Sequence, residues 1–184
     1  QLVNVDNIFY ASTPHSIIEF DYATNELRKL STVNGLSEVG ISSIVSNNSQ
    51  KALVIGYNSS NVDIIKDDKV INISSILNSS IIGDKTIYSL YSHSKFVYLC
   101  TGFGIVVIDL EREEIKDTYI IGNNGSQVAV LDIHISDNFI YALTNNHIKY
   151  ADINSPFLSD AAIWNQLATR LGAIFWSLVC EIVV

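Results

Sequence analysis

Residues 97–109 have the sequence VYLCTGFGIVVID, in which two apolar runs flank a short turn that contains two glycines. β-branched and aromatic residues on both sides of a tight turn predict an antiparallel β-hairpin. Similar hairpins occur elsewhere in the chain, and the residues equivalent to Tyr98 are Tyr10, Val54 and Tyr141. The steps between these residues are 44, 44 and 43, so the hairpin belongs to an internal repeat.

Each repeat predicts four antiparallel strands. A short apolar strand precedes the hairpin, at 2–5, 41–45, 87–91 and 130–135. The hairpin strands occupy 9–13 and 17–21, 53–57 and 62–66, 97–101 and 105–109, and 140–144 and 148–152. A fourth strand follows at 27–30, 70–73, 115–121 and 164–167. This unit is typical of a β-propeller blade, because a solenoid repeats every roughly 20–30 residues and a sandwich shows no constant step.

The composition agrees with an all-β class. The 184 residues include 27 Ile and 16 Val, while Asn (17) and Ser (22) dominate the polar fraction and favour turns. With 48% hydrophobic and 16% charged residues, the chain is not disordered, and strands such as 105–108 are apolar on both sides, as burial between two blades requires. The net charge of −8 argues against a nucleic-acid partner, which requires a basic face.

The predicted propeller spans residues 1–170, with blades at roughly 1–33, 41–76, 87–122 and 130–168. The nearly all-apolar residues 171–184 are either the first strand of a fifth blade or foreign sequence. Four blades are few for a closed ring. We therefore expect either a longer parent protein or a homodimer in which two chains pair their open edges into an eight-bladed ring.

The sequence features that bear on the cellular compartment are consistent with export. No apolar run reaches the roughly 18 residues that a membrane-spanning helix needs. The chain begins at Gln1 without a signal peptide, which fits a mature exported protein or a trimmed sequence. Cys100 lies in an apolar strand, which favours a buried free thiol, with a Cys100–Cys180 disulfide as the alternative.

The sequence contains no motif for nucleophilic, metal-dependent or dinucleotide chemistry, so we predict no enzymatic activity, no cofactor and no metal. Residues 83–86, GDKT, resemble the end of a phosphate loop, but they lack its upstream glycine and precede a strand, which favours a loop between blades. Asp21, Asp109 and Asp152 follow equivalent strands. We interpret them as turn residues whose carboxylates accept backbone N–H groups two residues further on.

Turns and blade-junction loops supply the candidates for ligand binding, because equivalent turns of a propeller lie on one face. His15 and His147 lie at comparable turns of the first and fourth repeats. Tyr57 and Phe103 offer rings that stack on a sugar, and for Phe103 burial between blades is the alternative. The candidate ligand-binding residues on this rim are His15, Asn34, Tyr57, Lys85, Phe103, Asn123, Asn146 and His147.

Several stretches resemble known repeat families. The junction 34–44, NGLSEVGISSI, is similar to the linker of two-component regulator propeller repeats, and 104–109, GIVVID, has their G-I-x-x-x-D pattern. A closer resemblance is to the N-terminal propeller of the PorZ-type subunit of the type IX secretion system of Bacteroidetes, and it covers roughly residues 8–168. The stretches that carry it are 83–87, 102–110 and 116–122.

This resemblance implies an exported, non-catalytic binding or scaffold protein of the periplasm or outer-membrane surface. It implies a protein partner in the secretion or envelope machinery, namely a sortase, and an anionic glycan ligand of the lipopolysaccharide type. The linker motif leaves open an alternative, the periplasmic ligand-sensing propeller of a hybrid two-component regulator.

Overall fold

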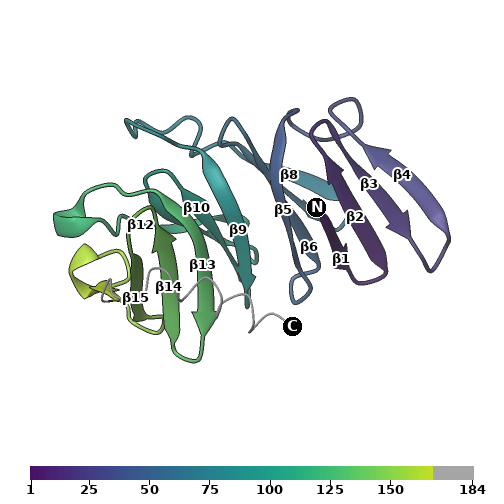
Figure 1. Ribbon diagram of the computed structural model, residues 1–184. Helices are drawn as coiled ribbons and strands as arrows, with labels where there is room; N and C mark the ends of the chain where they lie inside the picture. The colour runs from purple at the N-terminus through teal and green to yellow at the C-terminus, as the bar shows by residue number, and fades with distance from the viewer. Residues whose placement is uncertain (168–184) are drawn as a thin grey trace.

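The computed structural model describes residues 1–167, which form sixteen strands in four separate sheets (Figure 1). Each sheet has four antiparallel strands that lie side by side in sequence order. The predicted all-β class and the blades of a β-propeller are therefore confirmed. No helix within residues 1–167 is long and apolar enough to cross a bilayer. The predictions about residues 171–184 and about Cys180 lie outside the described residues.

The four blades follow one another along the chain. The first contains β1 (Leu2–Val5), β2 (Ile8–Thr13), β3 (Ser16–Asp21) and β4 (Glu26–Leu30). The second contains β5 (Ile41–Asn47), β6 (Ala52–Tyr57), β7 (Val62–Lys66) and β8 (Lys69–Ile73). The third contains β9 (Ile87–His93), β10 (Phe96–Thr101), β11 (Gly104–Asp109) and β12 (Glu114–Tyr119). The fourth contains β13 (Val130–Ser136), β14 (Phe139–Thr144), β15 (Ile148–Asp152) and β16 (Asn165–Gln166), with short 3₁₀ helices η1 (Asn123–Gly125) before β13 and η2 (Ala161–Ile163) before β16.

Turn chemistry fixes the hairpins. The carboxylate of the repeated aspartate accepts the backbone N–H two residues on, at 2.8 Å for Asp21 and 2.9 Å for both Asp109 and Asp152. The prediction that these residues are turn formers is confirmed. Gly104 begins β11 at a φ of +151°, and a Cβ there would lie 2.2 Å from the carbonyl oxygen of Tyr119. Only glycine fits this turn, because the backbone approaches too closely for any side chain.

Hydrophobic clusters fill the junctions between neighbouring blades. Along the second strand of each blade, successive side chains point to opposite faces of the sheet. In β10, Tyr98 faces the fourth blade, while Val97 and Leu99 face the second. All six residues of β11 are buried. The expectation that such strands are covered on both faces is therefore correct.

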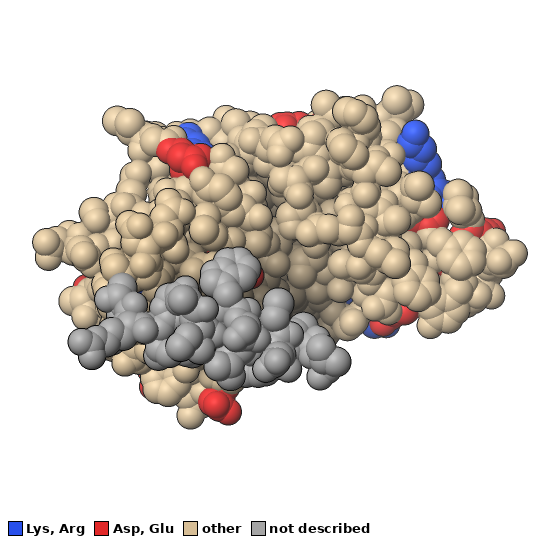
Figure 2. All heavy atoms as spheres, viewed as in Figure 1, with Lys and Arg blue, Asp and Glu red and all other residues tan. Residues whose placement is uncertain are grey.

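The four blades form an open arc. The first strands meet along its inner side, where β5 lies against β1 and β9, and β13 lies against β9. The first and fourth blades stand at opposite ends (Figure 1), and among the described residues no hydrophobic cluster joins them. Figure 2 shows that uncharged side chains dominate the side turned to the viewer and that charged ones are scattered.

Candidate binding face

The turns between second and third strands lie at the same end of every sheet as the connections between blades, because the strands of each blade run antiparallel. We call this end the connection face. Hydrogen bonds join its two kinds of segment, from Gly40 N to Pro14 O at 2.8 Å and from Gly102 N to Thr86 O at 3.1 Å. The face consists of the turns 14–15, 58–61, 102–103 and 145–147 and of the connections 31–40, 74–86 and 120–129.

All eight predicted rim residues belong to the connection face or border it, but two of them are buried. Tyr57 ends β6 and Phe103 lies in the turn before β11, and both have 0% exposed area. Phe103 packs in the cluster between the second and third blades. Neither ring offers a face to a sugar. The stacking role expected for Tyr57 is therefore wrong, because the ring is buried in the cluster between the first and second blades. For Phe103, the alternative of burial between blades is the one that the structure shows.

Tyr57 instead belongs to a buried polar network around Asp63. The carboxylate of Asp63, 0% exposed, accepts the Tyr57 hydroxyl at 2.6 Å and the Asn72 amide at 2.9 Å. It also accepts the backbone N–H of Ser37 at 2.8 Å and its hydroxyl at 2.7 Å. Burial, followed by the hydrogen bond to Asp63, raises the pKa of Tyr57. Because Ser37 lies in the connection 31–40, the network fixes that connection to the second blade.

Three more predicted residues already have structural partners. The Asn34 side chain accepts the N–H of Ser31 at 2.6 Å and donates to the carbonyl oxygen of Lys29 at 2.6 Å. Lys85 donates from Nζ to two carbonyl oxygens of its own connection, at 3.1 and 2.8 Å. Asn123 accepts from the ammonium group of Lys149 at 3.1 Å. These side chains shape the loops of the connection face.

Lys149 is a buried lysine that is not among the residues predicted from the sequence. It is 6% exposed, and its Nζ also donates to the carbonyl oxygen of Ile121 at 2.6 Å. Burial lowers the pKa of Lys149. Both acceptors, on Ile121 and Asn123, belong to the connection 120–129, so this lysine holds the connection in place.

The remaining predicted residues lie in the hairpin turns. His15 and Asn146 are exposed and His147 is partly buried. The two histidine turns are equivalent. The Thr13 hydroxyl donates to the carbonyl oxygen of Ser16 at 3.0 Å, and the Thr144 hydroxyl donates to the carbonyl oxygen of His147 at 2.8 Å. Within residues 1–167 no three His, Cys, Asp or Glu side chains converge on a metal-sized site.

Exposed apolar side chains on the connections are the feature that sequence reasoning missed. Val33 is 94% exposed and Val39 57% in the first connection. Ile82 is 88% exposed and Leu77 39% in the second, which projects beyond the sheets in Figure 1. Apolar residues within predicted loops were the available signal, because solvated loops seldom carry them without a partner.

An accessible aromatic residue follows the second connection in the chain. Tyr88 of β9 is 42% exposed, and its hydroxyl donates to Asp84 Oδ2 at 2.6 Å. Hydrogen bonds from Thr86 and Tyr88 lower the pKa of Asp84. The carboxylate therefore stays ionised beside an exposed ring, an arrangement that suits recognition of a polar ligand with one apolar face.

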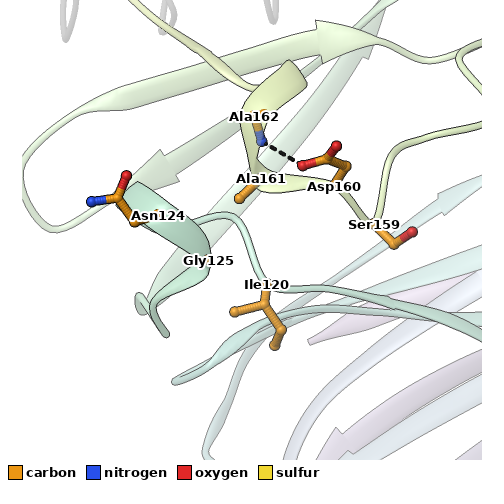
Figure 3. Close-up of a pocket in the computed structure, with 7 residues that line it drawn as sticks. All are labelled: Ile120, Asn124, Gly125, Ser159, Asp160, Ala161 and Ala162. Atoms are coloured by element: carbon orange, nitrogen blue, oxygen red, sulfur yellow. Dashed lines mark hydrogen bonds between the residues drawn. The ribbon is translucent and has the colours of Figure 1, made fainter.

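A cavity of about 450 Å³ lies where the connection 120–129 meets the loop that contains η2 (Figure 3). The carboxylate of Asp160 lies at its wall, and its Oδ1 accepts the N–H of Ala162 at 2.9 Å. Asp160 caps η2 and is the single carboxylate among the lining residues. No second acidic or basic side chain lines the cavity beside it. Those residues are Ile120, Asn124, Gly125, Ser159, Asp160, Ala161 and Ala162.

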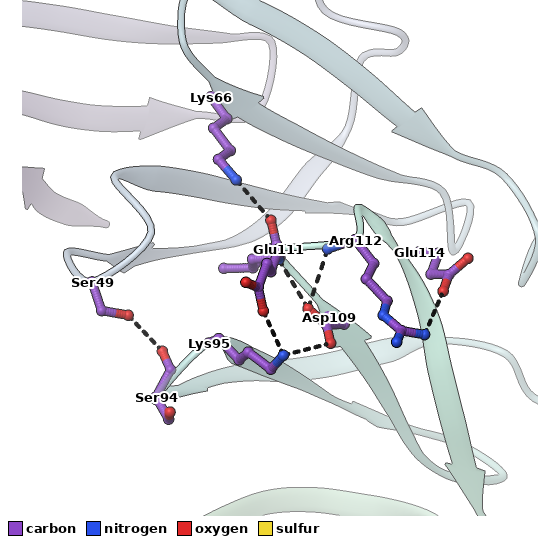
Figure 4. Close-up of polar contacts among 9 residues, drawn as sticks. Ser49, Lys66, Ser94, Lys95, Asp109, Glu111, Arg112 and Glu114 are labelled. Carbon is purple, nitrogen blue, oxygen red and sulfur yellow. Dashed lines mark hydrogen bonds and ion pairs between the residues drawn. The ribbon is translucent and has the colours of Figure 1, made fainter.

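The opposite end of the second and third blades carries contacts that join these two blades (Figure 4). Lys66 donates from Nζ to the carbonyl oxygen of Leu110 at 2.9 Å. The Ser49 hydroxyl donates to the carbonyl oxygen of Ser94 at 2.8 Å. These contacts fix the second blade to the third at the end of the sheets opposite the connection face.

A family model identifies a relationship more specific than a shared β-propeller fold. The model of the N-terminal β-propeller domain of PorZ, from the type IX secretion system, matches residues 9–165. No curated protein sequence is detectably similar to the chain.

Several solved structures share the fold of this chain. PorZ of Porphyromonas gingivalis, described as an essential bacterial surface component of the type IX secretion system, is 25% identical with a TM-score of 0.79, and the match covers 91% of this chain and 22% of PorZ. The extracellular domain of BT4673 of B. thetaiotaomicron, a putative one-component system, is 18% identical with a TM-score of 0.69, over 91% of this chain and 23% of that one. The designed protein Ika8 is 14% identical with a TM-score of 0.61, over 91% and 47%. The chain thus spans less than a quarter of the first two structures, and the last two show a shared fold alone.

Proposed function

This chain belongs to the family of PorZ N-terminal β-propeller domains, and on that premise we propose that it is an exported, non-catalytic scaffold that binds a protein of the secretion or envelope machinery. The similarity to a bacterial surface component and to an extracellular domain supports export. Periplasm and outer-membrane surface are both compatible with this assignment.

The observation that carries the proposal is the set of exposed apolar side chains on the connection face. Val33 and Ile82 are almost fully exposed on two neighbouring connections. The networks around Asp63 and Lys149 hold the first and third connections to rigid blades, so the face is largely preformed. Apolar tips on a preformed polar surface suit a protein partner, because burying them on binding removes apolar area from water.

We further propose that the same face binds an envelope glycan. Tyr88 supplies an exposed ring for a sugar, and Asp84 accepts hydrogen bonds from its hydroxyls. His15 and Asn146, both exposed in turns of this face, are the remaining polar contributors. The buried Tyr57 and Phe103 have no part in it.

Affinity purification from the envelope of the bacterium tests the protein-binding role. The tagged chain should recover type IX secretion proteins, and a Val33→Asp, Ile82→Asp double variant should recover at least about tenfold less, because each charge would be buried at the interface. Tyr22→Asp is the matched control, since Tyr22 is 52% exposed in the β3–β4 turn at the opposite end. Recovery of no envelope protein, or equal recovery by the double variant, contradicts the proposal.

Binding of purified lipopolysaccharide glycan tests the second role separately. Tyr88→Ala should weaken binding by about tenfold, as expected for loss of a stacking ring, whereas Tyr22→Ala should leave it unchanged. If Tyr88→Ala binds as tightly as the unsubstituted chain, the glycan site is not at Tyr88.

A ligand-sensing propeller of a hybrid two-component regulator is the second candidate. The linker 34–44 and the shared fold with the BT4673 extracellular domain favour it. The full gene decides between the two: a kinase encoded downstream supports the sensor, and its absence supports the secretion scaffold.

A further inference from the structure

Glu38 of the first connection meets the turn between β6 and β7 on the connection face. The Asn61 amide donates from Nδ2 to Glu38 Oε1 at 3.0 Å, and the Ser59 hydroxyl donates to Glu38 Oε2. The backbone adds a third link, from Asn58 N to the carbonyl oxygen of Gly40 at 2.9 Å. The carboxylate of Glu38 is therefore held in one position against the turn.

The Asn61 side chain beside this carboxylate has an unused acceptor. Asn61 is 4% exposed, and within residues 1–167 its Oδ1 is the one buried side-chain oxygen without a hydrogen-bond partner. Turning the amide around does not satisfy this oxygen, because the oxygen would then face the negatively charged Glu38. Buried oxygens are normally paired with a donor or a cation, so the site calls for a further group.

The surroundings of Glu38 are negatively charged. Among the described residues, neither Glu38 nor Asp63 forms an ion pair with a basic side chain. Burial, the hydrogen bond to Asp63 and the charges of Asp63 and Glu38 all raise the pKa of Tyr57, so both carboxylates act on the same hydroxyl group. Two negative charges without a basic partner favour the binding of a cation.

We propose that Glu38, Asn61 and Ser59 bind a calcium ion. Their side chains offer a carboxylate, the free Oδ1 and a hydroxyl, and oxygens of these kinds are the ligands that Ca²⁺ takes in proteins. The Ser59 hydroxyl accepts the N–H of Asn61 at 3.2 Å and retains a second lone pair for an ion. Ser59 is exposed, so an ion can enter from solvent and keep water as its remaining ligands. Mg²⁺ suits the site less well, because it requires near-ideal octahedral geometry.

The composition of the site sets its affinity. Affinity for Ca²⁺ depends on the number of charged ligands, and Glu38 is the single carboxylate among the three side chains, so we expect a Kd on the order of 10⁻⁴–10⁻³ M, as in extracellular calcium-binding modules. The ion would join the first connection, through Glu38, to the second blade, through Asn61 and Ser59.

Isothermal titration calorimetry of the full chain, freed of metal with a chelator, tests the proposal with calcium chloride. Saturable binding of one Ca²⁺ per chain is expected, and Glu38→Gln should weaken it by at least about tenfold, because the charged ligand is lost. Glu26→Gln is the matched control: Glu26 is exposed at the start of β4, at the opposite end, and its removal changes the net charge equally. Circular dichroism verifies that each variant is folded.

Three results overturn the proposal: no saturable binding of Ca²⁺, equal binding by Glu38→Gln and the unsubstituted chain, or equal affinity for magnesium chloride.

Asn61→Asp gives a second test that a purely structural role of Asn61 does not share. This variant places a second carboxylate beside Glu38, so without calcium the two charges repel and the melting temperature should fall. With calcium, the added charged ligand should tighten binding by at least about tenfold, and the melting temperature should recover. Calcium binding no tighter than in the unsubstituted chain, or a lower melting temperature that calcium does not restore, overturns the assignment of Asn61 as a ligand.

Discussion

Replacement of Tyr57 by Phe should destabilise the propeller by about 2 kcal/mol, although it removes a single oxygen atom. The hydroxyl donates to Asp63 Oδ2 at 2.6 Å, and both residues are 0% exposed. The ring keeps its packing, so no cavity forms beyond the volume of the hydroxyl. The loss is that of one hydrogen bond to a charged group, which contributes about 1.5–3 kcal/mol.

Urea unfolding at neutral pH, followed by circular dichroism, measures the change in the free energy of unfolding. Tyr22→Phe is the matched control, because Tyr22 is 52% exposed and should change stability by less than about 0.5 kcal/mol. In an Asp63→Asn background the cost of Tyr57→Phe should fall by about 1 kcal/mol, since the charged acceptor is then absent.

Two results would refute this reasoning. A Tyr57→Phe variant that matches the Tyr22→Phe control within about 0.5 kcal/mol means that the hydroxyl contributes nothing to the network. A cost that is the same in the Asp63→Asn background means that Tyr57 acts through packing and not through Asp63.

Three further predictions concern buried groups. Burial raises the pKa of Tyr98 to about 12, so the folded chain keeps a proton that the unfolded chain loses near pH 10; stability should fall as pH rises from about 10 to 12, and Tyr98→Phe should reduce that fall in urea titrations. Burial also raises the pKa of the Cys100 thiol to about 12, so in a Cys180→Ser background a thiol reagent at pH 8 should react only after unfolding, and reaction of the native protein would contradict the burial. Gly104→Ala should lower the unfolding free energy by about 3 kcal/mol or prevent folding, because its Cβ would lie 2.2 Å from the Tyr119 carbonyl oxygen, and wild-type stability would show that the turn relaxes.

The sequence by itself determined the blades. Alternating and continuous apolar runs at steps of 44, 44 and 43 residues predict strands wherever they occur, because strand formation and tight turns depend on neighbouring residues. The turn role of Asp21, Asp109 and Asp152 was predictable for the same reason: each carboxylate bonds an amide two residues away. The placement of the rim candidates at one end of the sheets also follows from strand alternation alone.

Only the tertiary structure decided which of those candidates meet solvent. Tyr57 and Tyr88 are both tyrosines at the end of a strand on the connection face, yet one is 0% and the other 42% exposed. The difference arises from the packing of the neighbouring blade against Tyr57, and that contact between blades is not encoded by local sequence. The role of Lys149 could not be predicted from local sequence either, because its acceptors on Ile121 and Asn123 lie 28 and 26 residues away in the chain. Local patterns set the strands, while burial depends on contacts between blades that are brought together only by folding.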